Sequence, residues 1–473
     1  MLFNSISYLL FLPVVVLLHF SIPHRYRWML LLLGSYYFYM CWRVEYALLI
    51  LFSTAIDYFC GLQIEKNNAE NRRRFWLLLS IFTNLTILFT FKYSAFFLGN
   101  VQAVFDHFNI FANVPHFDLL LPVGISFYTF QSLSYTVDVY WRRVKAENHF
   151  GIFALYVSFF PQLVAGPIER PSQLLPQFYV KNTPDYQRFT GGLKLIVWGF
   201  FKKMVIADNL APYVNEVFAH PEIYHGAAVW LAALFFAFQI YCDFSGYSDI
   251  AIGSARILGY DLMLNFRQPY FSTSLNDFWR RWHISLSTWF RDYVYIPLGG
   301  NRTVKWRWYY NLMITFLVSG LWHGANWTFV IWGFLHAFFL ILGFLFFKNY
   351  RPKTDFLKNL SRLIVFLLVL ILWIFFRAEN LDAAIHLLKN LFDLSFWPQP
   401  PVGIYRKLAL LVACFSVFLL LIFEYLEQKK NSTLEIIVAR NGKQSEWIFY
   451  SFLVWLIFFF GDAGNQQFIY FTF

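Results

Sequence analysis

Charged residues are scarce in this 473-residue chain, where Lys, Arg, Asp and Glu make up 14% of the sequence, compared with about 25% in a typical soluble domain. Hydrophobic residues make up 59% and aromatic residues 23%. A soluble protein could not bury so much apolar surface, because single cores stop growing at about 250–300 residues. The composition therefore excludes a disordered, collagen-like, coiled-coil or soluble multidomain protein and indicates a polytopic membrane protein.

Cysteine is rare too, and the four cysteines are scattered without C-x-x-C spacing, which predicts buried free thiols and neither a disulfide framework nor a metal site. Several catalytic motifs are missing: a Walker A loop, H-E-x-x-H, aspartates at i and i+2, and G-x-S-x-G. Their absence argues against ATP hydrolysis, metalloproteolysis and a serine nucleophile elbow. The net charge of +11 is typical of basic cytosolic loops in a membrane protein, so no nucleic-acid partner is expected.

Apolar runs along the chain predict an all-α membrane fold with about ten to twelve crossings, since a crossing needs about 20 apolar residues. The first run lacks the basic region and cleavage site of a signal peptide and is expected to stay. Several runs are short and one is long, so we expect broken, tilted or re-entrant segments within a single integral-membrane domain, 1–473. The candidates are 5–22, 28–41, 46–62, 75–98, 119–140, 150–165, 190–207, 227–258, 308–322, 325–347, 359–377, 405–426 and 447–461.

The distribution of Lys and Arg predicts the orientation, because short cytosolic loops carry an excess of both. In the N-terminal half, basic loops alternate with the basic-poor loops 42–45 and 98–118; in the C-terminal half, the loop 378–403 contains only Lys389. Both termini are therefore expected outside the cytosol, which requires an even number of crossings. The basic residues lie at 25–27, 66–74, 142–145, 348–362 and 429–443.

One stretch, from Asp277 to Arg302, mixes tryptophan and arginine and suits neither a lipid-facing span nor an ordinary loop. Both residue types are typical of the membrane interface, so one interpretation is an interfacial helix that anchors the fold. The other is a re-entrant element that lines an opening from the cytosol, with His283 facing it, because irregular backbone at membrane depth is tolerated mainly beside a cavity. Its basic candidates are Arg280, Arg281, Arg291 and Arg302.

A second stretch places His323 in a region without charged residues from Arg307 to Lys348. An ionisable group at membrane depth is costly and is a functional hypothesis by default; the alternative is a structural histidine bonded to a neighbouring helix. Small flanking residues permit a helix break or the close approach of another chain or ligand. His336, on the following span, has no polar neighbours and is expected to be structural. The small residues are Ser319, Gly320, Gly324 and Ala325.

A third stretch places two carboxylates, Asp243 and Asp249, inside the long apolar run. They need partners or a water-filled cavity. Ser245, Asp249 and Gly253 recur every four residues and so share one helix face, which suits helix packing. The alternative is a tunnel wall on which a carboxylate orients a catalytic histidine.

Together these stretches resemble the membrane-bound O-acyltransferase family, most closely its branch of bacterial alginate O-acetyltransferases. The resemblance covers about residues 120–335. Relatives often end in FIYFQF, whereas this chain has Thr472 in that ending, which puts no catalytic residue in doubt. The D-alanyl transferase branch shares the two histidines but departs from the sequence motifs R-R-W-H and P-L-G-G-N-R. It is therefore the second candidate for the branch that this chain resembles. The matching segments are 162–168, 241–249, 265–272, 277–287, 291–302 and 320–324.

The resemblance implies helices around a central tunnel and a role for each histidine. His323 corresponds to the buried histidine that acts as general base, and His283 to a second histidine on the cytosolic side. A thioester donor would enter from the cytosol and an acceptor from outside, meeting near His323. Further tunnel-lining or orienting candidates, some of which could fix the tautomer of the base, are Asp243, Ser245, Asp249, Asn326 and Trp322.

The implied chemistry agrees with the residues present. A thioester is already activated, so the enzyme needs mainly a base and a dry, oriented site; neutral histidine suits this task because its ordinary pKa is about 6.5. No tightly bound cofactor is expected, and the donor would be acetyl-coenzyme A or an acyl-carrier thioester. The four arginines of the Asp277–Arg302 stretch could meet the donor's phosphates or an acidic carrier.

The sequence thus predicts an O-acyltransferase of the bacterial cytoplasmic (inner) membrane that moves acetyl groups toward an extracytoplasmic polysaccharide. The resemblance also implies a periplasmic, serine-hydrolase-like (SGNH) acetyltransferase as partner. Two alternatives remain open at this point. One is the transfer of D-alanine or another acyl group to a cell-envelope polymer, and the other is a non-enzymatic polysaccharide transporter or channel.

Overall fold

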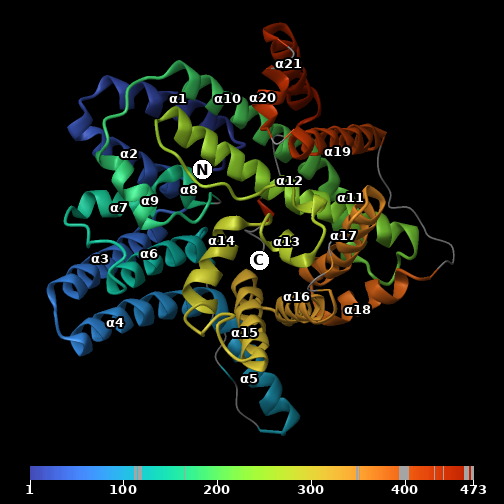
Figure 1. Ribbon diagram of the computed structural model, residues 1–473, viewed down its shortest axis with the longest axis horizontal. Coiled ribbons are helices and arrows are strands. Elements are labelled where there is room, and N and C mark those ends of the chain that lie inside the picture. The colour runs from blue at the N-terminus through green and yellow to red at the C-terminus, as the bar shows by residue number, and fades with distance from the viewer. Residues whose placement is uncertain are drawn as a thin grey trace. The chain divides into compact units, whose positions relative to one another are not determined.

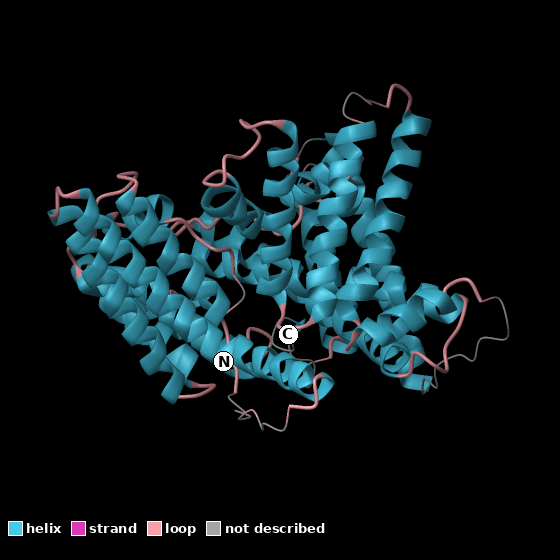
Figure 2. Ribbon diagram, turned by 90° about the horizontal axis from the view of Figure 1, so that it is seen from below, coloured by secondary structure: helices cyan, strands magenta, loops and turns pink. Residues whose placement is uncertain are grey.

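The computed structural model describes residues 1–110, 114, 120–164, 166–347, 350, 352–393, 404–430, 432–439, 442–462 and 468–469. All regular structure in these residues is helical (Figures 1 and 2), which confirms the predicted all-α fold. Parts of the loops 98–118 and 378–403 lie outside the described residues, as do Lys348, Arg351 and 470–473. The chain divides into two compact units, 1–192 with 254–263, and 193–253 with 264–473.

The first unit is held together by polar as well as apolar contacts between its long helices. Asp57 of α3 is fully buried, and its Oδ1 accepts hydrogen bonds from Ser80 (2.6 Å) and Asn84 (2.8 Å) of α4. Such bonds join helices where water is absent. The helices are α1 (Ile6–Ser21), α2 (His24–Met40), α3 (Glu45–Lys66), α4 (Glu70–Leu88), η1 (Phe89–Tyr93), α5 (Ser94–His107), α6 (Ile125–Tyr140), α7 (Phe150–Ser158), α8 (Phe160–Leu163), α9 (Pro171–Leu174), η2 (Leu175–Tyr179) and the start of α10 (Tyr186–Phe200).

The second unit has an aromatic core in which Trp282, Trp332 and Trp373 are fully buried. The ring of Trp373 lies 5.0 Å from that of Trp282 and 6.0 Å from that of Trp332. The elements are η3 (Phe201–Ala207), α11 (Asp208–Ala219), α12 (Ala227–Ile257), η4 (Pro269–Phe271), α13 (Leu275–Trp279), α14 (Ile284–Phe290), η5 (Arg291–Tyr295), α15 (Lys305–His323), α16 (Trp327–Phe346), α17 (Asp355–Arg377), α18 (Leu381–Asn390), α19 (Ile404–Lys430), α20 (Leu434–Ala439) and α21 (Lys443–Phe460), following the end of α10.

Six segments within the described residues are long and apolar enough to cross a membrane. This is fewer than the ten to twelve expected, because helices such as α1, with 16 residues, are shorter than a full crossing. The long run 227–258, for which a broken, tilted or re-entrant segment was expected, forms one unbroken helix, α12, of 31 residues. It is longer than the bilayer core at 1.5 Å per residue. The six segments are Glu45–Lys66, Glu70–His107, Ala227–Ile257, Trp327–Phe346, Asp355–Arg377 and Lys407–Lys430.

The three basic loops of the first unit are joined to one another by hydrogen bonds. Arg73 donates to the carbonyl of Tyr140 (2.5 Å), which links the second and third loops. His24, beside the first loop, contacts the carbonyl of Tyr179 (3.3 Å), whose own hydroxyl donates to Glu147 (2.6 Å) next to the third loop. These contacts bring residues of the three basic segments close together, and the side of a membrane on which they lie stays a prediction.

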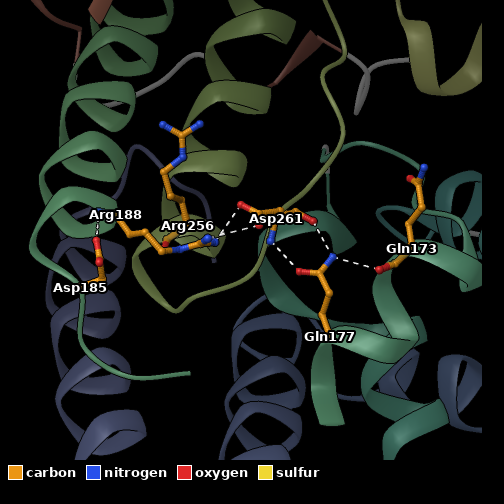
Figure 3. A network of polar contacts seen from close by, with 6 residues as sticks. All are labelled: Gln173, Gln177, Asp185, Arg188, Arg256 and Asp261. Carbon is orange, nitrogen blue, oxygen red and sulfur yellow. Dashed lines mark hydrogen bonds and ion pairs between the residues drawn. The ribbon is translucent and has the colours of Figure 1, made fainter. Parts of the chain in front are cut away.

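A polar network fixes the segment 254–263 on the same unit (Figure 3). The guanidinium of Arg188 pairs with the carboxylate of Asp261 (2.8 Å), and the side chain of Gln177 bonds both the backbone N–H and the carbonyl of Asp261. Asp185 accepts from the backbone N–H of Arg188 (2.7 Å) and so fixes the start of α10. The network joins the end of α12 to η2 and α10.

All four cysteines are free thiols. Cys60 and Cys242 are buried, as expected, whereas Cys41 and Cys414 are exposed. Cys414 lies in an apolar candidate span, where an exposed side chain faces the space that lipid would occupy.

Candidate active site

His323 is the last residue of α15 and lies at the turn into α16. The two helices touch through glycine: a methyl group on Gly333 would lie 3.3 Å from the Cα of Gly320, and one on Gly320 would collide with the carbonyl oxygen of Phe329. The helix breaks after His323, which is one of the possibilities that the small residues permitted, and the segment that approaches them closely is α16 of the same chain.

Asn326 shapes this turn as the N-cap of α16. Its Oδ1 accepts from the backbone N–H of Thr328 (3.1 Å), and its Nδ2 donates to the carbonyl of Glu379 (2.7 Å). An N-cap side chain satisfies one of the backbone donors that the first helical turn leaves unpaired. The geometry thus gives Asn326 a capping role at the turn.

His323 is enclosed by aromatic rings from three helices and is only 3% exposed. The ring of Trp322 lies 5.0 Å away, that of Trp332 on α16 5.1 Å, and that of Phe376 on α17 5.2 Å. An imidazole in such surroundings is shielded from water. Electrostatic effects on a reacting group are stronger in a site from which water is excluded.

Trp322 also connects the two predicted histidines. Its indole lies 5.0 Å from the imidazole of His323 and 6.1 Å from that of His283, edge to face in both cases. The fold therefore brings the two imidazoles into contact with one shared ring, although they are far apart in the sequence.

His283 is fully buried at the N-cap position of α14, with a left-handed backbone (φ 41°). Its Nδ1 lies 3.1 Å from Oδ1 of Asn265, and the ring of Phe244 from α12 packs edge-on at 4.5 Å. Burial lowers the pKa of His283 to about 3, so the imidazole is neutral near pH 7. Sequence reasoning did not single out Asn265, although it opens the matching segment 265–272.

Asp243 is paired with a lysine that sequence reasoning overlooked. The Nζ of Lys203, in the π-helix η3, lies 2.7 Å from Oδ1 of Asp243 and 2.7 Å from Oδ1 of Asp208. The other oxygen of Asp243 accepts from the backbone N–H of Ile469 (2.7 Å). Asp243 therefore holds η3 and the segment 468–469 to the middle of α12.

Asp249 and Ser245 share a second lysine of the same π-helix. The Nζ of Lys202 lies 2.5 Å from Oδ2 of Asp249 and donates to Oγ of Ser245 (3.0 Å). Close packing brings the lysines here, since a methyl group on Gly199 of α10 would lie 2.6 Å from the carbonyl oxygen of Gly246 of α12. Two carboxylates in an apolar helix require partners, and here the partners are the adjacent residues Lys202 and Lys203. These two lysines stand out in the sequence because they lie within the apolar run 190–207.

The four arginines differ in their surroundings. Arg281 pairs with Asp277 (2.9 Å), and Arg291 pairs with Asp292 (2.7 Å). Arg280 and Arg302 are exposed, and neither side chain forms an ion pair with a described residue. Of these four arginines, Arg280 and Arg302 are therefore the two whose guanidinium groups have no carboxylate partner among the described residues.

His336 lies in α16, fully buried, with the ring of Trp332 at 4.7 Å and that of Trp279 at 5.0 Å. Neither of its nitrogens has a hydrogen-bonding partner among the described residues. Within the same part of the chain, no group of three or more His, Cys, Asp or Glu side chains is arranged to hold a metal ion.

Comparison with known proteins identifies the family. The model of the membrane-bound O-acyltransferase family matches residues 149–381, which include both histidines. The chain is 43% identical to a probable alginate O-acetylase of Azotobacter vinelandii, over 84% of this chain and 79% of that protein. It is 42% identical to a probable alginate O-acetylase of Pseudomonas aeruginosa, over 94% and 85% of the two chains. It is 39% identical to the peptidoglycan O-acetyltransferase of Helicobacter pylori, over 77% and 73%.

These matches agree with the motifs that first suggested the family, and the apolar helices agree with its membrane location. The chain belongs to the membrane-bound O-acyltransferase family and is an integral membrane enzyme that transfers acyl groups to hydroxyl groups.

Proposed function

We propose that this enzyme transfers an acetyl group from a thioester donor on the cytosolic side toward a hydroxyl of an extracytoplasmic polysaccharide, with His323 as general base. The observation that carries the proposal is the enclosure of His323 by Trp322, Trp332 and Phe376 at a turn fixed by glycine contacts. A buried histidine at a rigid turn combines a proton acceptor with a site from which water is excluded.

The reaction needs few groups. A nitrogen of His323 takes the proton of the acceptor hydroxyl, the oxygen attacks the thioester carbonyl, and the carbon–sulfur bond breaks. The proton then leaves with the departing thiolate, so the histidine is neutral again at the end of the cycle. A base of this kind typically contributes about 10²–10⁴-fold to the rate.

The acceptor class follows from the relatives. The matching proteins from Azotobacter vinelandii and Pseudomonas aeruginosa are described as alginate O-acetylases, and the one from Helicobacter pylori as a peptidoglycan O-acetyltransferase. All these acceptors are polysaccharides outside the cytosol. An alginate-type exopolysaccharide is our first candidate, because the alginate relatives match at higher identity and over more of the chain, and peptidoglycan is the second.

The donor is acetyl-coenzyme A or an acyl-carrier thioester, recognised in this proposal by Arg280 and Arg302. Arginine suits phosphate because its planar guanidinium donates several hydrogen bonds at once. Exchanging both for Gln should raise the KM for the donor and leave kcat nearly unchanged. The matched control exchanges Arg281 and Arg291, whose guanidinium groups already pair with carboxylates.

We place the enzyme in the bacterial cytoplasmic membrane with both termini outside the cytosol and a funnel that joins the two faces near His323. The hydrogen bonds that bring the three basic segments of the first unit close together support this orientation, since short cytosolic loops are rich in Lys and Arg. A periplasmic, serine-hydrolase-like acetyltransferase of the SGNH class would complete the modification. Deletion of that partner should leave thioester turnover intact and abolish O-acetylation of the polymer.

The decisive experiment compares His323→Ala with His336→Ala, since both histidines are buried against Trp332. Each variant is purified, checked for a monodisperse folded state, and assayed for turnover of labelled acetyl-coenzyme A, and each is tested in cells for ester-linked acetate on the polysaccharide. We expect His323→Ala to abolish both activities and His336→Ala to retain them. Wild-type acetylation by folded His323→Ala would overturn the mechanism.

The same assay separates the proposal from other functions of a membrane protein with polar interior residues. A polysaccharide channel or transporter would move polymer without consuming the thioester. Transfer of D-alanine or of a longer acyl group would appear in the mass spectrum of the modified polymer in place of acetate.

A further inference from the structure

We infer that Asn265 is a positioning residue for the reaction, which holds His283 with its proton on Nδ1 and leaves the lone pair on Nε2. This inference rests on the proposed acetyl transfer and assigns a defined state to the second histidine. Asn265 lies in the segment 265–272, which is one of the segments that resemble the family. The resemblance assigned no role to Asn265. The evidence comes from the bonds around its side-chain amide.

The orientation of that amide is fixed by a group that can only donate. The backbone N–H of Ser285 points at one atom of the Asn265 amide at 3.3 Å, and the hydroxyl of Ser285 donates to the same atom at 2.8 Å. A backbone N–H has no acceptor capacity, so the atom facing it is the oxygen. The amide nitrogen then points the other way, where it donates to Oγ of Ser248 (3.2 Å).

The tautomer of His283 follows from this orientation. Its Nδ1 lies 3.1 Å from the same oxygen of Asn265, and an amide oxygen only accepts hydrogen bonds, so Nδ1 carries a hydrogen. A neutral imidazole has one N–H, which leaves Nε2 as the nitrogen that can accept a proton or a hydrogen bond. Since burial lowers the pKa of His283 to about 3, the neutral form is the relevant one.

The carboxylates Asp243, Asp249 and Asp277 of α12 and α13 are each paired with a basic side chain. On α12, whose Phe244 packs on the imidazole, the carboxylates of Asp243 and Asp249 are paired with lysines. On α13, Asp277 pairs with Arg281, and Arg280 is exposed. On α15, the titratable neighbour is His323, which contacts the other histidine through Trp322. Burial is the one cause of the lowered pKa and keeps the ring neutral. The hydrogen bond that Nδ1 donates to Asn265 then decides which nitrogen carries the proton.

Asn265 also fixes the backbone that carries His283. Its carbonyl accepts from the N–H of Ile284 (2.8 Å), and the carbonyl of His283 accepts from Ser287 (2.9 Å). His283 has a left-handed backbone (φ 41°), a conformation that non-glycine residues adopt mainly where the surroundings impose it. One residue thus sets the backbone, the ring orientation and the proton position of His283.

The test uses Asn265→Ala and Asn265→Asp in the full-length enzyme, with kcat and donor KM measured across about pH 5 to 8. Asn265→Ala removes the acceptor for Nδ1, and we expect a fall in kcat of at least about tenfold with an unchanged donor KM. Asn265→Asp keeps the shape but places a carboxylate against Nδ1, which stabilises the imidazolium. We expect the acid limb of its kcat profile to move up by about one pH unit or more.

Ser248→Ala is the matched control, because it removes the partner of the Asn265 amide nitrogen and leaves the bond to His283 in place. Its kcat should stay within about threefold of the wild type, as expected for loss of a single remote hydrogen bond. A role of Asn265 in backbone packing alone would lower the activity of Asn265→Ala without moving the pH profile of Asn265→Asp. An unmoved profile in a folded, active Asn265→Asp enzyme therefore overturns the inference, as does wild-type kcat in Asn265→Ala.

Failure of the inference can be told apart from failure of the proposed function. If His323→Ala keeps wild-type acetylation, the acyl-transfer mechanism itself is wrong. If His323→Ala is inactive and Asn265→Asp shows the wild-type pH profile, only the role of Asn265 is wrong. Should Asn265→Ala fail to fold, the nearly isosteric Asn265→Asp still decides the question through its profile.

Discussion

Lys203 and Asp243 form an ion pair between the π-helix η3 and the middle of α12, with Nζ 2.7 Å from Oδ1 and both side chains at most 3% exposed. Lys203 also pairs with Asp208, and Asp243 also accepts from the backbone of Ile469. Two charges taken out of water are tolerated only when such additional bonds satisfy them. The pair therefore joins two elements of the second unit. The carboxylate of Asp243 is bonded to Lys203 and to the backbone of Ile469, which gives it a structural role in place of the predicted role of orienting a histidine.

Exchanging Lys203 for Met should strongly destabilise the protein, because it leaves the carboxylates of Asp243 and Asp208 buried without a cation. Removing one partner of a buried ion pair typically costs about 3–5 kcal/mol. Lys202→Met is the matched control: it lies next in the same π-helix, but its partner Asp249 is 17% exposed. Thermal unfolding in detergent should show the larger loss for Lys203→Met, and equal losses for the two variants would contradict this reading.

Exchanging Gly320 for Ala should separate α15 from α16 and displace His323, since the added methyl group would collide with the carbonyl oxygen of Phe329. Inserting a methyl group into a closely packed interface costs about 1–3 kcal/mol. We expect lower thermal stability together with lower acetyl transfer. Gly343→Ala on α16 is the control, because its methyl group would meet nothing within 4 Å. An active, fully stable Gly320→Ala enzyme would show that the contact does not position the histidine.

Sequence reasoning succeeded where the cause is local. Apolar runs predicted the all-α fold, and the small residues around His323 indicated that the chain could break or be closely approached there, because glycine acts on the backbone beside it. These features need no knowledge of the tertiary structure.

Sequence reasoning failed where the cause is a contact between distant segments. The aspartates of α12 were considered as orienting groups for a histidine, yet Lys202 and Lys203 hold them, at a distance of about forty residues in the chain. The partner of His283 is Asn265, which nothing in a single sequence marks as adjacent to that ring. Spacing along one helix shows which side chains share a face, but it does not show what that face meets.

Glu169 predicts a dependence of stability on pH in the first unit. Its carboxyl group is 1% exposed and accepts from the backbone N–H of Met263 (2.7 Å). Burial raises its pKa from 4.5 to about 7, so the folded state holds a proton that the unfolded state releases at about 4.5. The stabilisation is full below about pH 4.5 and is lost as the pH rises through about 7.

Exchanging Glu169 for Gln should therefore flatten the stability profile between those two pH values. The measurement is the thermal midpoint of unfolding in detergent at several pH values, for the wild type and for Glu169→Gln. The wild-type midpoint should fall across the interval relative to that of the variant. A parallel fall in both proteins would mean that another group is responsible.

Trp322 should decide whether the reaction is protected from water. Its indole contacts the imidazoles of both His283 and His323, so its removal would open space between them. Trp322→Ala should lower acetyl transfer to the acceptor by at least about tenfold and raise hydrolysis of the thioester when no acceptor is present, because water reaches the activated carbonyl. Trp322→Phe, which keeps an aromatic ring in place, should retain more of the transfer. Trp327→Ala, at an exposed position close by in the chain, should change neither rate. If Trp322→Ala loses transfer without gaining hydrolysis, the indole orients the reactants and does not exclude water.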